Sequence, residues 1–337
     1  MIVLTGASGH IGTNLVTALL ARGRRVRVVE YVPSDGLVGL PVERVPGDVR
    51  SPQTLRDAMA GAHTVIHLAG HISIGKHDAA LLGPVNVQGA HNVAQACVDT
   101  GVQRLVHFSS IHALTPFPLD RPVDEDRGFT SHKHAPRYDR SKAKGEQAIQ
   151  AIAAKSGLHV VTILPSGVIG PNDTRPSEMG RILVRLANGK LAGLVTNAGF
   201  NWVDVRDVVA GTLTAMDSAP AGSRYLLAGE RRDIVHIAEA IERLGFARAP
   251  RLRIGLELVR RMAPFSAAVV RTFGGRPQVT PDSIHALLHH QEVSTEKAQR
   301  ELNYRPRPFE ETLRDTLDWF VASGHVAPPR RMPLLAL

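Results

Sequence analysis

Short runs of apolar residues alternate with longer amphipathic stretches through the first half of the chain. Runs rich in Val, Ile and Leu occupy residues 2–4, 25–29, 64–68, 104–108 and 160–164. Their apolar character is continuous, which is typical of strands buried on both faces. The stretches between them carry apolar residues at helical spacing, as at Ile11, Leu15 and Leu19. This alternation predicts an α/β fold built on a doubly wound parallel sheet.

The pattern loosens after Pro165, and the last third of the chain is mostly helical and rich in Arg. We therefore expect residues 1–170, with a return near 198–220, to form the domain that contains the sheet. Residues 171–197 and 221–325 are expected to form a smaller, mostly helical substrate-binding domain, and residues 326–337 a tail.

A glycine-rich motif, TGASGHIG at residues 5–12, follows the first predicted strand and opens the first predicted helix. Gly6, Gly9 and Gly12 allow a tight turn, a close approach of backbone N–H groups to a pyrophosphate, and close packing of helix on strand. The helix N-terminus favours the bound anion. In this strand-turn-helix context the motif indicates a dinucleotide site.

An acidic residue, Glu30, stands at the end of the second predicted strand, eighteen residues after Gly12. A carboxylate there accepts hydrogen bonds from the ribose hydroxyls and repels a 2′-phosphate, which favours NAD over NADP. Arg24, Arg25 and Arg27 are close in sequence, and an arginine that reached a 2′-phosphate would reverse the preference.

Two further segments follow predicted strands and complete the expected cofactor site. Asp48 and Val49 are positioned for the adenine amino group. Leu68, Ala69 and Gly70 end another strand, where small residues let a cofactor lie against the sheet.

A tyrosine and a lysine, Tyr138 and Lys142, are four residues apart at the start of a predicted helix. Residues at this spacing share one helix face, so an ammonium group can stabilise the phenolate. Ser109 and Ser110 end the strand that precedes this helix. The three residue types together suit proton transfer at a hydroxyl or carbonyl oxygen.

These motifs resemble the extended branch of the short-chain dehydrogenase/reductase superfamily, whose fold is Rossmann-like. The resemblance covers nearly the whole chain, through TGASGHIG, GDV, VIHLAG, NVQGAHNV, LVHFSS, YDRSK, ILPSGVIGP, NWVDVRDVV and STEKAQRELNYRPRPFEETLRDTLDWF. It implies an enzyme in which Tyr138 is the acid/base with a lowered pKa, Lys142 holds the nicotinamide ribose, and Ser110 binds the reacting oxygen.

The resemblance also extends the set of cofactor contacts. Ser109 is the alternative to Ser110, because such serine pairs are ambiguous by one position, and Asn86 matches a family asparagine. The remaining implied contacts are Ser8, His10, Ile11, Pro165 and Val168. The family often dimerises through two helices, here near residues 88–100 and 138–155, so a homodimer is expected.

Two kinds of enzyme within this branch stay open. Nucleotide-sugar epimerases and dehydratases commonly carry an Arg and an Asn before a Gly-Pro turn, whereas residues 163–171, ILPSGVIGP, contain neither. That run favours a reductase or dehydrogenase acting on a secondary alcohol or carbonyl of a small molecule. A nucleotide-sugar epimerase or dehydratase is the alternative. A non-catalytic dinucleotide sensor is disfavoured, because Tyr138 and Lys142 are both present.

Composition and charge exclude other classes of protein. The 337 residues are 43% hydrophobic and 21% charged, with a net charge of +9. Seven Arg and one Glu between residues 246 and 276 account for +6 of that charge, so it is a local feature, and we expect neither nucleic acid nor membrane as a partner. Some of these Arg are candidates for steering an anionic substrate.

The cysteine and histidine residues bear on metal binding, and the N-terminal sequence bears on the cellular location of the protein. A single cysteine, Cys97, excludes an internal disulfide, and the 16 His show no recognisable ligand spacing, so no metal is expected. The first residues show no secretory pattern, and no apolar run is long enough to span a membrane. The sequence therefore favours a cytoplasmic protein.

Overall fold

A seven-stranded parallel sheet organises the N-terminal part of the protein. The computed structural model describes residues 1–33, 35–73, 79–133, 135–256, 258–259 and 292–329. The strand order is β10-β6-β5-β4-β1-β2-β3. The strands are β1 (Ile2–Thr5), β2 (Val26–Glu30), β3 (Glu43–Pro46), β4 (Thr64–His67), β5 (Arg104–Phe108), β6 (His159–Pro165) and β10 (Arg224–Leu227). The predicted doubly wound, Rossmann-like sheet is confirmed.

Two strands of this sheet were not expected from the sequence. Strand β3 is an edge strand, Glu-Arg-Val-Pro, in which two of the four residues are charged, so it shows no apolar run. Strand β10, which we had assigned to the substrate-binding domain with the rest of residues 221–325, pairs in parallel with β6 and belongs to the large sheet. Its four residues are too few to show a period of their own.

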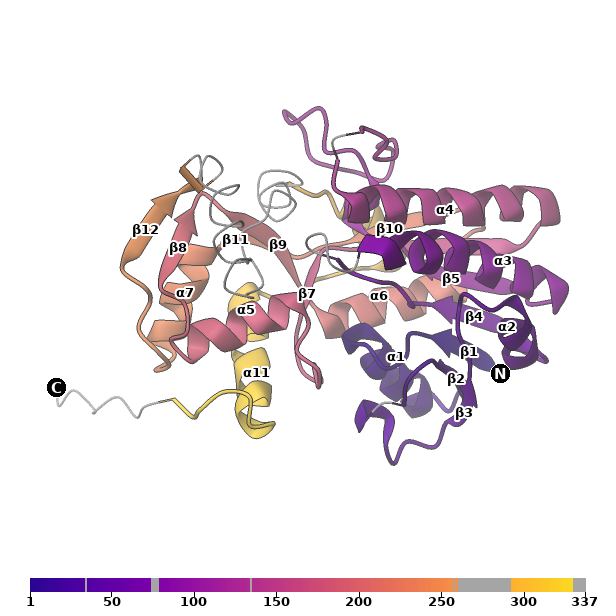
Figure 1. The fold of residues 1–337 in the computed structure, drawn as a ribbon, viewed down its shortest axis with the longest axis horizontal. Helices are drawn as coiled ribbons and strands as arrows, with labels where there is room; N and C mark the ends of the chain where they lie inside the picture. Colours follow the sequence, from indigo (N-terminus) through magenta and orange to yellow (C-terminus); the bar gives the residue numbers. More distant parts are fainter. Residues whose placement is uncertain (34, 74–78, 134, 257, 260–291, 330–337) are drawn as a thin grey trace.

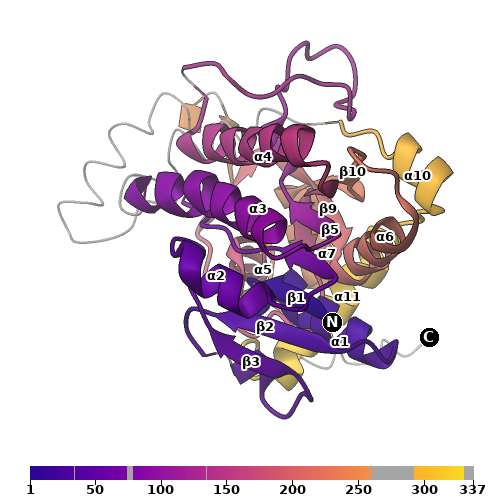
Figure 2. The ribbon, with the colours of Figure 1, turned by 90° about the vertical axis from the view of Figure 1, so that its right-hand side faces the viewer.

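Helices cover both faces of the large sheet. They are α1 (His10–Ala21), α2 (Pro52–Met59), α3 (Gly89–Asp99), α4 (Arg137–Ser156), α6 (Val205–Ser218) and α10 (Glu296–Leu302). Figure 2 shows α2, α3 and α4 side by side on one face and α1 and α6 on the other. Two apolar cores result: Leu15, Val28 and Val208 lie in one, and Leu55, Val65 and Ile149 in the other. Burial of these faces is the main stabilising contribution.

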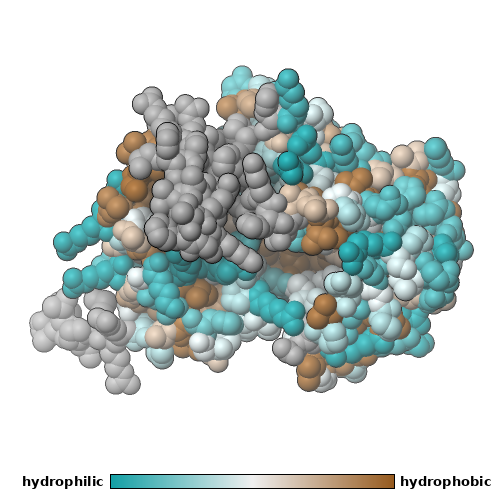
Figure 3. All heavy atoms as spheres, viewed as in Figure 1, coloured by the Kyte–Doolittle hydropathy of each residue, from teal (hydrophilic) through white to brown (hydrophobic). Residues whose placement is uncertain are grey.

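A smaller part packs beside the large sheet (Figure 1). Its helices are α5 (Glu178–Ala187), α7 (Ile234–Arg243) and α11 (Phe309–Ala322), and its strands are β7 (Gly167–Ile169), β8 (Gly193–Thr196), β9 (Gly199–Asp204), β11 (Glu230–Asp233) and β12 (Leu252–Gly255). These strands form two small sheets, β11-β9-β7 and β12-β8. Trp202, Phe309 and Phe320 lie in its separate core. From the side of Figure 1, a recess separates the two parts, with apolar residues visible at its base (Figure 3).

Short helical turns connect several strands to the helices that follow. They are η1 (Asp35–Leu37), η2 (Ala79–Leu81), the π-helical segment η3 (Leu82–Gln88) and η4 (Ile111–Ala113). Segment η3 runs directly into α3, and it packs against α4 so closely that a Cβ on Gly145 would lie 2.1 Å from the Asn86 carbonyl oxygen. Glycine at this position therefore allows the two helices to meet.

Candidate active site

The predicted site residues gather at the carboxyl ends of the parallel strands. The glycine loop follows β1, Glu30 ends β2, Leu68 follows β4, and Ser109 follows β5. Parallel strands place these ends at one edge of the sheet, where ligands of open α/β sheets bind. Two further residues expected to contact the cofactor lie nearby in the chain: Pro165 ends β6, and Val168 lies in β7.

Three glycines shape the loop between β1 and α1 in different ways. Gly6 has φ of 74°, and a Cβ there would lie 2.5 Å from the backbone nitrogen of Ala69. A Cβ on Gly12 would lie 2.4 Å from the Gly6 carbonyl oxygen. A Cβ on Gly9, by contrast, would meet only that oxygen within 4 Å, at 3.5 Å. Packing within the protein therefore requires glycine at 6 and 12, whereas Gly9 leaves open space at the N-terminus of α1, as a phosphate site needs.

His10 ties this loop to the segment that follows β7. Its Nε2 lies 3.0 Å from the Pro171 carbonyl oxygen, which also accepts from Asn14 Nδ2 at 3.1 Å. Burial lowers the pKa of His10, so the ring is neutral at neutral pH. The His10 side chain, expected to contact the cofactor, thus holds the glycine loop in place, and Ser8 and Ile11 flank it in the same turn.

The Glu30 carboxylate is oriented for a ligand with hydroxyl groups. Its Oε1 is buried without a hydrogen-bond partner among the described atoms, and its Oε2 lies 3.6 Å from Arg44 Nε. A buried acceptor without a donor is costly, so this oxygen suits the ribose hydroxyls of NAD. Arg27 donates instead to the carbonyl oxygens of Ala58 and Ala60, at 2.8 and 2.9 Å. The residues present therefore fit NAD.

Asp48 is engaged by a neighbouring arginine. Its Oδ1 accepts from the Arg50 backbone at 2.8 Å and from Arg50 Nε at 3.0 Å, and this pairing lowers the pKa of Asp48. The Arg50 guanidinium in turn lies 5.2 Å from the centre of the Tyr31 ring. Val49 is buried, and its carbonyl oxygen accepts from Asn92 Nδ2 at 3.0 Å. No sequence motif predicted the contact between Arg50 and Tyr31.

Tyr138 and Lys142 lie on the first turns of α4, as the spacing predicted. The Lys142 Nζ donates to the Phe108 carbonyl oxygen at 2.7 Å, and the side chain is buried. A Cβ on Gly70 would lie 3.8 Å from that Nζ and 3.5 Å from Asn86 Oδ1. The segments after β4 and β5, the η3 segment and α4 therefore meet at Lys142.

The two serines after β5 interact with different residues of α4. The Ser110 side chain is a hydrogen-bond partner of the Tyr138 phenol and lowers its pKa. The Ser109 hydroxyl is buried without a hydrogen-bond partner among the described atoms, and its proximity lowers the pKa of Glu146, further along α4. Ser110 is thus the serine that lies beside Tyr138. The sequence alone did not decide between Ser109 and Ser110.

The pKa of Tyr138 differs from the expectation. Burial raises it to about 12, with a further rise from Asp139 that opposes the effect of Ser110. Tyr138 is therefore a protonated phenol at neutral pH, although the residue as a whole is only half-buried. The pKa of Lys142 is lowered by burial to about 8, with an opposing effect of Glu146.

Asn86 holds the turn after β4 against the start of α4. Its Oδ1 accepts from the His71 backbone at 2.7 Å, and its Nδ2 donates to the His71 carbonyl oxygen and to Ser141 Oγ, both at 2.9 Å. Ser141 Oγ donates to the Tyr138 carbonyl oxygen at 2.7 Å. Asn86 thus orders the backbone around Tyr138.

An imidazole-carboxylate pair that no sequence motif predicted lies next to Tyr138. His112 Nδ1 lies 3.7 Å from Asp139 Oδ2, and the His112 and Tyr138 rings meet edge to face at 6.1 Å. Burial lowers the pKa of His112, but Asp139 outweighs it, so the net shift is upward. The signal in the sequence was proximity alone: His112 follows Ser110 by two residues, and Asp139 follows Tyr138.

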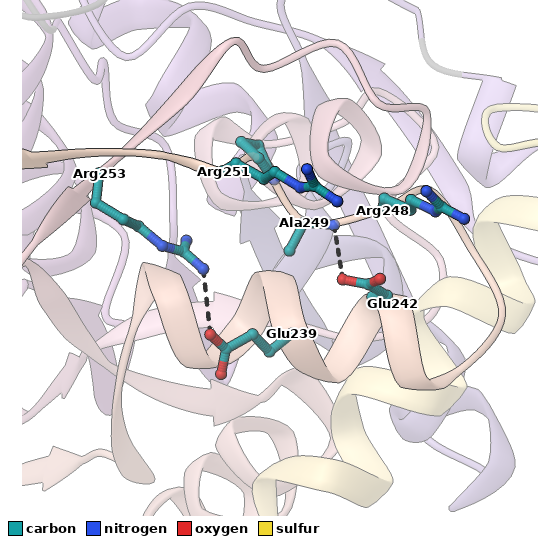
Figure 4. Close-up of a pocket in the computed structure, with 7 residues that line it drawn as sticks. Glu239, Glu242, Arg248, Ala249, Arg251 and Arg253 are labelled. Carbon is teal, nitrogen blue, oxygen red and sulfur yellow. Dashed lines mark hydrogen bonds and ion pairs between the residues drawn. The ribbon is translucent and has the colours of Figure 1, made fainter.

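The basic stretch at residues 246–276 is described only in part, because Arg260, Arg261, Arg271 and Arg276 lie outside the described residues. Arg248, Arg251 and Arg253 line an open hollow beside α7 (Figure 4). Carboxylates lie among them: Arg253 is paired with Glu239 at 3.2 Å, and Glu242 accepts from the Ala249 backbone at 3.0 Å. The described part of this hollow has mixed charge.

The described residues contain neither a cluster suited to a metal ion nor a helix suited to cross a membrane. No group of three or more His, Cys, Asp or Glu side chains in that part of the chain could hold a metal ion. In the same residues, no helix has the length and apolar character needed to cross a membrane.

Comparison with known proteins identifies the family. The family model described as "NAD dependent epimerase/dehydratase family" matches residues 2–228. The chain is 36% identical over 328 residues to the sterol demethylase protein B of Methylococcus capsulatus, covering 96% of this chain and 99% of that protein. It is 27% identical to the 3beta-hydroxysteroid-dehydrogenase/decarboxylase isoform 1 of Arabidopsis thaliana, covering 94% and 79%.

A solved structure, that of gox2253, shares the fold over the whole chain. Its TM-score is 0.85 at 26% identity, covering 97% of this chain and 99% of that one. The family match spans the glycine loop, the tyrosine-lysine helix and strand β10. The chain therefore belongs to the NAD dependent epimerase/dehydratase family, within the extended short-chain dehydrogenases/reductases, and is an NAD-dependent enzyme.

Proposed function

We propose that the protein oxidises a secondary alcohol, or reduces the corresponding ketone, on a small apolar ring system of the sterol class. The observation that carries this proposal is the convergence of Ser110, Tyr138 and Lys142 at the carboxyl end of β5. NAD, when bound, exchanges a hydride with the carbon that carries the oxygen. The names of the two relatives support a sterol or steroid as the substrate.

The chain's own residues act on the substrate oxygen. Tyr138 gives its phenolic proton to that oxygen in reduction. In oxidation Tyr138 first loses that proton to water, and its phenolate then takes the proton of the substrate hydroxyl. Ser110 donates a hydrogen bond to the oxygen as negative charge develops there. The buried Lys142 ammonium, one helical turn further along α4, stabilises the phenolate that proton transfer leaves.

The glycine loop and the strand ends hold the cofactor in this proposal. Gly9 and the N-terminus of α1 would hold the pyrophosphate, and Glu30 would bind the adenosine ribose. Gly70 and Asn86 border the nicotinamide end, next to Lys142.

Oxidation of a panel of alcohols tests the proposed substrate class. We expect 3-hydroxysterols and hydroxysteroids to reduce NAD, measured as the rise in nicotinamide absorbance, and nucleotide sugars to give no reaction. Conversion of a nucleotide sugar with no net absorbance change would replace this proposal by the alternative, an epimerase or dehydratase, which the family description also covers.

Glu30→Ala is expected to remove most of the preference for NAD over NADP. The carboxylate repels a 2′-phosphate and binds the ribose hydroxyls, so its loss should weaken NAD binding about tenfold or more and leave NADP binding unchanged or tighter. Titration of each dinucleotide against protein fluorescence measures both. Glu43→Ala, on the neighbouring edge strand, is the matched control, and equal losses for both dinucleotides would contradict the assignment.

We further propose a homodimer formed through α3 and α4. The outward faces of these helices border a groove lined by apolar and polar residues: His91, Gln95, Val98, Ala148, Ala151, Ile152, Lys155 and Ser156. Sedimentation should give a dimer that Ala151→Arg converts to a monomer, because the new charge would be buried in the interface. A monomeric wild-type protein at micromolar concentration would contradict this interface.

A further inference from the structure

A row of polar side chains crosses the interior of the large sheet beneath α4. Five residues stand in register on five adjacent strands: Thr5, His67, His107, Thr162 and Arg224. The first four are at most 3% exposed. Interior strands of a parallel sheet are normally apolar on both faces, and the row two residues earlier, from Val3 to Val160, follows that rule. The polar row is therefore a local exception that needs an explanation.

The two histidines of this row are neutral. His67 Nδ1 lies 2.7 Å from Thr5 Oγ1, and the His67 and His107 rings stack with their centres 5.4 Å apart. Burial and the nearby Lys142 ammonium lower the pKa of His67 to about 3 and that of His107 well below its ordinary value. The histidines thus supply polarity beneath Lys142 but no charge.

The row ends at Arg224, which forms a buried ion pair. Arg224 Nε lies 2.8 Å from Glu146 Oε1, and the Glu146 side chain is fully buried. Glu146 follows Lys142 by one helical turn, so both side chains lie on the face of α4 that covers the sheet. Burial raises the pKa of Glu146, while Arg224, Ser109 and Lys142 lower it. Two cations on either side favour its ionised form.

We propose that Glu146, held by Arg224, is a positioning residue that keeps the buried Lys142 ammonium protonated and directed at the site of proton transfer. Among the charged and titratable groups that face Lys142, the histidines of β4 and β5 are neutral, and Glu146 is the one that opposes the effect of burial on the lysine. The consequence for catalysis rests on the proposed function, in which Lys142 stabilises the Tyr138 phenolate.

Lysine titration measures this directly, without substrate or cofactor. The chain has seven lysines, so ¹³C labelling at lysine Cε gives seven resonances, and Lys142→Arg identifies that of Lys142. In the wild type we expect a titration midpoint near pH 8. In Glu146→Gln the midpoint should fall by about one pH unit or more, because the opposing negative charge is gone. An unchanged midpoint would overturn the proposal.

Two further variants keep the test decisive. Lys144→Gln removes an exposed charge from the same helix and should leave the Lys142 midpoint unchanged. Glu146→Asp retains the charge at a greater distance and should give a midpoint between those of wild type and Glu146→Gln. If Glu146→Gln does not fold, Glu146→Asp decides the question, and a midpoint equal to that of the wild type counts against the role.

The pH profile of turnover provides a second readout. In Glu146→Gln, Lys142 should lose its proton at a lower pH than in the wild type. The alkaline limb of the kcat profile should therefore shift to lower pH by the same amount as the Lys142 midpoint, while KM for the alcohol changes little. A fall in kcat that is equal at every pH would indicate a structural role only. Failure of the proposed substrate class would leave the lysine titration unaffected, so the two hypotheses fail separately.

Discussion

Tyr138→Phe should lower kcat by about three orders of magnitude while the protein still binds NAD. General acid–base catalysis by one positioned side chain contributes about 10²- to 10⁴-fold, and the substitution removes only the phenolic O–H. The ring remains in place against His112, so the fold should be retained. Turnover of the preferred alcohol and fluorescence titration with NAD measure the two effects separately.

A matched tyrosine provides the control for this substitution. The Tyr225 hydroxyl donates to Glu301 Oε2 at 3.0 Å on the other side of the sheet from α4, so Tyr225→Phe also removes one hydrogen bond. We expect it to retain nearly full activity. Equal activity of Tyr138→Phe and Tyr225→Phe would exclude Tyr138 as the proton donor and acceptor.

Gly12→Ala should destabilise the protein by about 2 kcal/mol or more and abolish detectable NAD binding. The new Cβ would lie 2.4 Å from the Gly6 carbonyl oxygen and 2.7 Å from Ala7 Cα. These are backbone atoms, so relief requires that α1 move away from the end of β1, and overpacking of this kind costs about 1–3 kcal/mol. Thermal unfolding and NAD titration are the measurements.

Gly9→Ala separates the effect on stability from the effect on NAD binding. A Cβ at this position has ordinary contact distances within the protein, so the melting temperature should stay within about 2 °C of the wild type. NAD binding should nevertheless weaken about tenfold or more, because the methyl group occupies space that the pyrophosphate needs. Normal NAD binding by Gly9→Ala would place the phosphates elsewhere.

Much of the candidate site could be predicted because its chemistry is local. Glycines at fixed spacing and a Tyr-Lys pair on one helix face are recognised within a dozen residues, and the strand before each is an apolar run. Contacts between residues distant in sequence could not be predicted. The Arg50 guanidinium lies over the Tyr31 ring, and His10 is bonded to Pro171. No local pattern reports such contacts.

The sequence by itself determined the parallel sheet, the position of the dinucleotide loop and the helix that carries Tyr138 and Lys142, because strand burial and helical spacing follow from the order of residues along the chain. Only the tertiary structure decided which serine lies beside Tyr138, and that the pKa of this tyrosine is raised. It also placed β10 in the large sheet, bringing Arg224 to Glu146 from 78 positions away. Burial and electrostatic pairing depend on which strands become neighbours, and those neighbours are set by packing of the whole fold.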